Sequence, residues 1–423
     1  MSSRLSAITV LKNRDFRLYA LNALLTQLAA EILIVAIQWS IYDISNDPFD
    51  LGLVGLVQFL PSCLLVLLTG AAADRYSRKG ILILCALAEF GCILGIFLVS
   101  SAGLHQVWPI LTLIAVLAAG RAFAGPAMLA MAPALVERDQ IPAAIATSTS
   151  AWQFSAIAGP ALGGVLYGLS PTVAYVTALV MVAIGGVAII GIHHREERRR
   201  PEATSFDEMI GGFRFMLREK VVLGAASLDL FAVLLGSATA LLPVFAKDLT
   251  HGVWGLGLFR AGIGIGALIM AVYLGLRPIR RRAGFLMFAA VAVFGLGTIA
   301  FGLSHWIGLS VAALILMGAS DMISVYIREV LVQLWTPDSL RGRVNAVYIL
   351  MINASNELGS FRAGWSGATF GPVTAVVAGG FCTVACAALW AKWFPALRNA
   401  DDLTETEQLE PELHEAAKAS MLD

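Results

Sequence analysis

Twelve long apolar stretches recur along the chain, and short polar segments separate them. A helix needs about 20 mostly apolar residues to cross the ~30 Å hydrocarbon layer of a membrane. The stretches lie near residues 16–42, 51–73, 81–100, 107–130, 144–169, 172–192, 221–245, 253–276, 285–303, 306–334, 344–365 and 373–394. Runs such as 111–119 and 180–192 do not alternate between apolar and polar positions, as barrel strands would. The pattern predicts an all-α polytopic membrane protein with twelve transmembrane helices.

Composition agrees with this prediction. Of the 423 residues, 58% are hydrophobic and only 14% are charged, whereas about a quarter are charged in soluble domains. The 29 basic residues balance 29 acidic ones, so we expect no nucleic-acid partner. All five cysteines fall in apolar stretches, where they are expected to be small packing residues. The sequence predicts no metal site and no cofactor.

The positions of Lys and Arg predict the orientation, because loops on the cytoplasmic side are enriched in both. With the N-terminus inside, every inner segment is basic, and Lys247 is the one Lys or Arg of the outer loops. We therefore expect a multi-pass protein of the plasma membrane (the bacterial inner membrane) with both termini in the cytoplasm.

The chain divides into two halves of six stretches each. We expect an N-terminal six-helix bundle at 1–192, a cytoplasmic linker with an amphipathic helix at 193–220, a C-terminal six-helix bundle at 221–396 and an acidic cytoplasmic tail at 397–423. Charged turns at 136–139 and 336–343 lie about 200 residues apart, as in a duplicated unit. Transporters are often built from such repeats, with the substrate site between them.

The loop after the second stretch contains Gly70, Asp74, Arg75, Arg78 and Lys79. Gly70 allows close helix packing, and the basic residues are typical of an intracellular loop. This pattern resembles the signature loop of the major facilitator superfamily. The resemblance implies two pseudo-symmetric six-helix bundles, which this loop latches together on the cytoplasmic side. The equivalent segment 275–282 of the second half lacks the aspartate.

Two further motifs resemble the same family. Arg121, in the fourth stretch, is similar to the family's buried arginine, which implies a link to proton coupling. Gly159, Pro160, Gly163 and Gly164, in the fifth stretch, resemble the antiporter motif of exporters. Their own chemistry supplies a proline kink and a smooth glycine face for packing.

Residues 331–345 resemble the branch that holds the enterobactin exporter and the macrolide-type drug:proton antiporters. The resemblance covers about residues 12–396. It implies a proton-coupled exporter of a small organic molecule that works by alternating access. Its expected partners are the substrate, protons and the lipid bilayer, and we expect a monomer.

Inserting an ionisable residue into the membrane within a span costs about 2.5–3.5 kcal/mol or more, so we expect each such residue to have a structural or functional role. Gln27, Glu31 and Gln38 share one face of the first span. In the resembled fold this face would line the central cavity, so Glu31 is the first candidate for binding substrate or a proton. In the alternative, Glu31 is a structural partner of Arg121. Substrate or proton-coupling candidates from the other cavity helices are Arg121, Asp229 and Asp321.

The remaining buried charges are interpreted as structural or gating groups: Glu89, Arg260, Arg328, Glu357 and Arg362. Glu89 and Arg121 lie at matching depths, which predicts an ion pair. Arg328 is interpreted as a gate or packing charge. Arg260 and Arg362 lie toward the outer side and could pair with Glu357.

Motifs of common enzyme classes are missing, including the Gly-x-x-x-x-Gly-Lys-Ser/Thr loop and Gly-x-Ser-x-Gly. We therefore predict a secondary transporter and no enzyme. A dedicated siderophore exporter is the close alternative. Alternatives of another class are a lipid facilitator without proton coupling and a membrane sensor.

Overall fold

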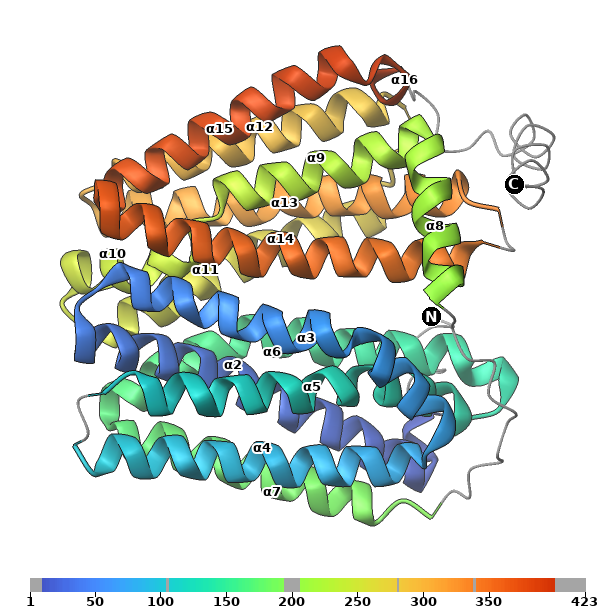
Figure 1. Cartoon of the computed structure of the whole chain (residues 1–423), viewed down its shortest axis with the longest axis vertical. Helices are drawn as coiled ribbons and strands as arrows, with labels where there is room; N and C mark the ends of the chain where they lie inside the picture. The colour runs from blue at the N-terminus through green and yellow to red at the C-terminus, as the bar shows by residue number, and fades with distance from the viewer. Residues whose placement is uncertain (1–9, 104–105, 194–205, 280, 338–339, 400–423) are drawn as a thin grey trace. The chain divides into compact units, whose positions relative to one another are not determined.

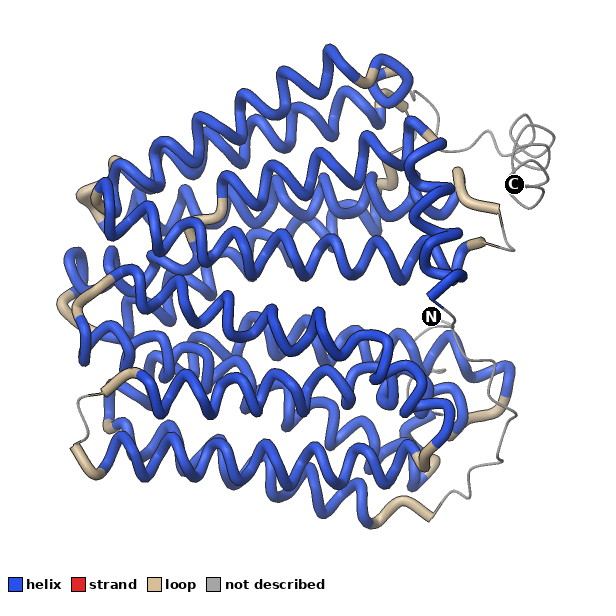
Figure 2. Tube along the Cα trace, viewed as in Figure 1, coloured by secondary structure: helices blue, strands red, loops and turns tan. Residues whose placement is uncertain are grey.

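The computed structural model describes residues 10–103, 106–193, 206–279, 281–337 and 340–399, and every regular element in these ranges is a helix (Figure 1). Figure 2 shows the same all-helical trace without strands. The long helices are α2 (Arg14–Ser45), α3 (Pro48–Arg75), α4 (Arg78–Ser101), α5 (Trp108–Ala134), α6 (Ile141–Leu169), α7 (Pro171–Ile190), α9 (Lys220–Gly236), α11 (Val253–Leu276), α12 (Ala283–Gly302), α13 (Ile307–Leu334), α14 (Arg341–Phe370) and α15 (Pro372–Trp393). The short ones are α8 (Phe206–Arg218), α10 (Leu242–Thr250), α16 (Pro395–Arg398) and the 3₁₀ turns η1 (Arg138–Gln140) and η2 (Thr239–Leu241).

The helices account for the twelve predicted spans. Within the described residues, ten segments are long and apolar enough to cross a membrane, one of them Lys220–Thr250. The other two predicted spans are α6 and α14, which carry more polar side chains. Each is the fifth long helix of its half, so the two halves repeat the same departure from an apolar helix.

The described helices fall into two compact units. The first unit contains α2 to α7 together with Pro243–Ala261. Within it, α2 packs on α6 and α7, α3 packs on α5, and α4 packs on α5 and α7. Asn13 caps the start of α2 by accepting hydrogen bonds from the amides of Asp15 and Phe16.

The second unit contains α8, α9 and the residues from Gly262 onward. Here α9 packs on α14 and α15, and α12 packs on α13 and α15. Gly266 and Gly318 let the part of α11 that belongs to this unit approach α13 closely. A side chain at either position would meet the backbone of the facing helix. These pairings repeat those of the first unit helix by helix, as expected of a duplicated six-helix bundle.

The seventh predicted span differs from the expectation of one continuous helix over residues 221–245. Helix α9 ends at Gly236, and the chain passes through η2 before α10 begins at Leu242. Pro243 has no amide hydrogen to continue the helical ladder, and its ring crowds the preceding turn. Arg362 of α14 compensates for the break by donating to the freed carbonyls of Leu234 (3.1 Å) and Ser237 (2.8 Å).

Helix α8 occupies the part of the linker where the amphipathic helix was predicted. It crosses the ends of α9 and α14 (Figure 1), with which it is in contact. Phe215 and Met216 are buried in a cluster with residues of α9 and α14. Phe213 and Leu217 of the same helix are half exposed. Helix α8 therefore contacts the protein through Phe215 and Met216.

Candidate functional site

Glu31 lies midway along α2 and is bonded to its own helix. Gln27, one turn earlier, donates from Nε2 to Glu31 Oε1 at 3.2 Å. The carboxylate also interacts electrostatically with Arg260 and Arg121. The predicted neighbourhood of Gln27 and Glu31 is confirmed, and Glu31 lies among cations of its own unit.

Gln38, the third residue of the predicted polar face, has a different partner. Its side chain is buried, and its Oε1 accepts from Arg260 Nη2 at 2.8 Å. Arg260 therefore lies between Gln38, to which it donates, and Glu31, whose charge it offsets. The polar face of α2 divides into a Gln27–Glu31 pair and a Gln38–Arg260 pair.

Arg121 of α5 forms the ion pair with Glu89 of α4 that their matching depths predicted, at 2.7 Å. The Glu89 side chain is 12% exposed and that of Arg121 is 40% exposed. Glu89 is thus the ion-pair partner of Arg121, while Glu31 also interacts electrostatically with Arg121, so a structural role of Glu31 toward Arg121 stays an alternative. Arg121 also lines a small pocket of about 40 Å³ between α2, α3 and α5.

The antiporter motif of α6 packs directly onto α2. Gly159 faces the Glu31 stem so closely that an added side chain would collide with Glu31 Cβ. Gly163 faces the backbone of Ile32, and Gly164 faces the backbone of Gly257. Pro160 lies inside the helix. The missing side chain at Gly159 therefore leaves the space that the Glu31 side chain occupies.

The loop motif holds helix ends of its own unit. Arg78 donates to the carbonyl of Ala130 in the last turn of α5 at 2.9 Å. Lys79 donates to Ile190 and Ile192, at the end of α7, at 2.8 and 2.6 Å. Cations at helix C-termini satisfy the last carbonyls and the helix dipole.

The other three residues of the loop motif give less structural information. Arg75 is exposed in the last turn of α3. Gly70 and Asp74 also belong to α3, but their surroundings lie outside the residues described in side-chain detail.

The second unit contains a buried ion pair between Asp229 of α9 and Arg328 of α13. Arg328 also donates from Nε to the Tyr348 hydroxyl of α14, so it joins three helices. The sequence named Asp229 and Arg328 separately, but their pairing and Tyr348 were missed. Glu89 and Arg121 lie on adjacent helices, which made depth a usable signal, whereas neither the packing of α9 on α13 nor a tyrosine in a span gives such a signal.

Asp321 lies about two turns before Arg328 on α13 and lines a pocket with Asp229. It interacts electrostatically with Asp229 and Arg328. Farther along α14, Arg362 is bound to the two carbonyls at the end of α9. Pairing of Glu357 with Arg260 or Arg362 stays a prediction.

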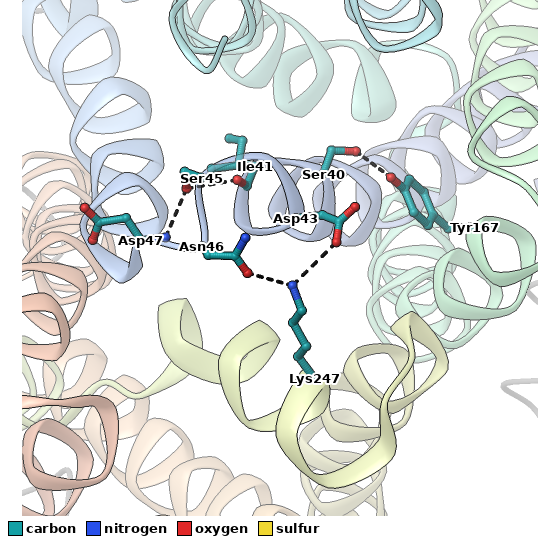
Figure 3. A network of polar contacts seen from close by, with 8 residues as sticks. All are labelled: Ser40, Ile41, Asp43, Ser45, Asn46, Asp47, Tyr167 and Lys247. Carbon is teal, nitrogen blue, oxygen red and sulfur yellow. Dashed lines mark hydrogen bonds and ion pairs between the residues drawn. The ribbon is translucent and has the colours of Figure 1, made fainter. Parts of the chain in front are cut away.

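Lys247 of α10 organises a polar network that sequence reasoning also missed (Figure 3). Its ammonium donates to Asn46 Oδ1 at 2.7 Å and lies 3.5 Å from an Asp43 oxygen, both at the end of α2. It also lies 5.2 Å from the centre of the Tyr42 ring. The signal was available, because Lys247 is the one Lys or Arg of the predicted outer loops, and the end of the first span carries Asp43 and Asp47.

Comparisons with known proteins agree with this arrangement. The family model described as transmembrane secretion effector matches residues 5–420. The enterobactin exporter EntS of Escherichia coli O139:H28 is 25% identical over 388 residues, which cover 86% of this chain and 88% of that protein.

Solved structures show the same fold. A D-xylose–proton symporter has a TM-score of 0.70 at 14% identity and covers 91% of this chain and 98% of its own. A bacterial homologue of the iron transporter ferroportin has a TM-score of 0.66 at 16% identity, covering 90% and 98%. The chain therefore belongs to the transmembrane secretion effector family of the major facilitator superfamily, whose members are multi-pass membrane transporters of small molecules and not enzymes.

Proposed function

We propose that this chain is a proton-coupled exporter of a small organic molecule, in which Glu31 carries the proton. The observation that supports it best is the setting of Glu31: a carboxylate in the middle of a spanning helix, bonded to Gln27 and enclosed by Gly159 of the antiporter motif. An ionisable group at this depth is costly and therefore functional by default.

The surroundings of Glu31 suit a group that changes its charge. Arg260 and Arg121 interact electrostatically with its carboxylate. Each cation also has another partner, Gln38 for Arg260 and Glu89 for Arg121. Neither cation is therefore left without a bond when Glu31 takes up a proton, so the carboxyl can alternate between a protonated form and a substrate-bound form.

The test compares Glu31→Gln with Asp248→Asn in proteoliposomes under an imposed pH gradient. A macrolide and a catecholate siderophore are the transported probes. We expect Glu31→Gln to abolish gradient-driven movement of the transported probe while binding of that probe persists. Asp248→Asn, a control at an exposed carboxylate of α10, should retain gradient dependence. Full gradient-driven transport by Glu31→Gln would contradict the proposal.

A dedicated siderophore exporter is the second candidate, and the similarity to EntS over most of both chains favours it. Cations inside the spans, such as Arg121 and Arg260, suit an anionic catecholate or carboxylate. Deleting the gene and measuring secreted iron chelators together with drug sensitivity separates the candidates. Loss of a secreted chelator at unchanged drug sensitivity supports siderophore export.

We also propose that the protein lies in the bacterial inner membrane as a monomer, with both termini in the cytoplasm. The support is the distribution of Lys and Arg, which leaves Lys247 as the one basic residue of the outer loops. In this arrangement the linker 193–220 and the tail 397–423 are both cytoplasmic.

A further inference from the structure

A small pocket inside the second unit is lined by four residues with side-chain oxygens and by four apolar residues. It lies between α9, α12 and α13 and has a volume of about 20 Å³. Its polar lining comes from Asp229, Asp321, Ser320 and Ser324, and its apolar lining includes Phe294. A space of roughly 10–15 Å³ already holds one water-sized guest, so the pocket has room for a single atom and little more.

The charges around the pocket do not cancel. Arg328 neutralises Asp229 through their buried ion pair, and its Nε donates a hydrogen bond to the Tyr348 hydroxyl. Asp321 accepts no hydrogen bond from the described residues. With both carboxylates ionised, these two groups and one guanidinium leave one net negative charge, and a buried charge without a partner is costly.

Ser324 gives an independent indication of a ligand. It is 5% exposed, and among the described residues its hydroxyl has no hydrogen-bond partner. Ser320, one turn earlier, donates its hydroxyl hydrogen to the Leu316 carbonyl at 2.8 Å, which leaves its lone pairs open to the pocket. Buried hydroxyls nearly always have a hydrogen-bond partner. A ligand bound in the pocket would supply the partner that the Ser324 hydroxyl lacks among the described residues.

We propose that this pocket binds one sodium ion through Asp321, Ser324 and the free oxygens of Asp229 and Ser320. Carboxylate and hydroxyl oxygens are the donors that hard cations prefer, whereas sites for softer metals use nitrogen or sulfur. The single net negative charge matches a monovalent ion and would leave a divalent ion uncompensated. The volume excludes an organic cation.

The experiment measures binding of radioactive sodium (²²Na⁺) to the purified full chain in lipid nanodiscs. We expect saturable binding to one site per chain, displaced by unlabelled sodium and not by choline. Asp321→Asn and Ser324→Ala should each weaken it by about tenfold or more, as loss of groups around a metal typically does. Ser310→Ala is the matched control, because Ser310 is a buried serine of the same helix that bonds to Ser304.

Folding of each variant is checked by its melting temperature. Ser324→Ala removes only a hydroxyl without a partner, so it keeps the test decisive if Asp321→Asn fails to fold. Absence of saturable binding to the folded wild type, or unchanged binding to Ser324→Ala, overturns the proposal. The assay involves no transport and Glu31→Gln should leave it unchanged, so its failure is distinct from failure of proton-coupled export.

Discussion

At position 159 of α6, the packing against α2 leaves room for a hydrogen atom only. A methyl group there meets Glu31 Cβ, which cannot rotate away because it is attached to the backbone of α2. Overpacking of this kind costs about 1–3 kcal/mol. We therefore expect Gly159→Ala to lower the melting temperature and to reduce transport by displacing Glu31.

Gly168, on the same helix, is the matched control for that substitution. A side chain there would meet only Val253 at an ordinary contact distance of 3.5 Å. We expect Gly168→Ala to keep wild-type stability and transport in the same proteoliposome assay. Equal behaviour of the two variants would contradict the positioning role of Gly159.

Asp229 and Arg328 lead to a second prediction at the residue scale. Removing one member of a buried ion pair leaves the other charge uncompensated, which costs about 3–5 kcal/mol. Asp229→Asn should therefore strongly lower the melting temperature of the purified protein. Asp229→Asn combined with Arg328→Met should recover part of the loss, and additive losses would show that the two side chains do not depend on each other.

The sequence shows which charged residues lie inside spans. It shows their partners only where two charged residues lie at the same depth in adjacent spans. Glu89 and Arg121 lie on adjacent, regular helices, so counting residues from the inner ends placed them together. Asp229 and Arg328 come from spans far apart in sequence, and the packing that joins α9 to α13 is not encoded in either helix alone. Ser324 is one of many span serines, and only the structure shows that its hydroxyl lacks a partner.

The apolar pattern predicts the positions of the helices closely, because a segment that spans the lipid must satisfy its own backbone hydrogen bonds and therefore forms a helix. The break after Gly236 was missed because its residues are as apolar as a spanning helix. Arg362 makes the break possible by supplying donors to two carbonyls. Hydrogen bonds to charged groups contribute about 1.5–3 kcal/mol, so Arg362→Ala should clearly lower the melting temperature.

A conservative variant checks that this effect arises from the carbonyls at the end of α9. Arg362→Lys keeps the charge but cannot donate to two separated oxygens from one planar group. It should lie between the wild type and Arg362→Ala in melting temperature. If Arg362→Lys and Arg362→Ala melt alike, the charge of Arg362 contributes nothing on its own.

For the whole molecule, the sequence predicts an orientation that the fold by itself does not reveal. Helix α4 offers a direct test, because Tyr76 precedes its basic end and Ser101 is its last residue, and both are exposed. In a background with the five native cysteines replaced, Ser101→Cys should react with a membrane-impermeant maleimide on intact cells. Tyr76→Cys should react only after the membrane is permeabilised. The reverse pattern would place Arg78 and Lys79 outside and would contradict the cytoplasmic assignment of the loop motif.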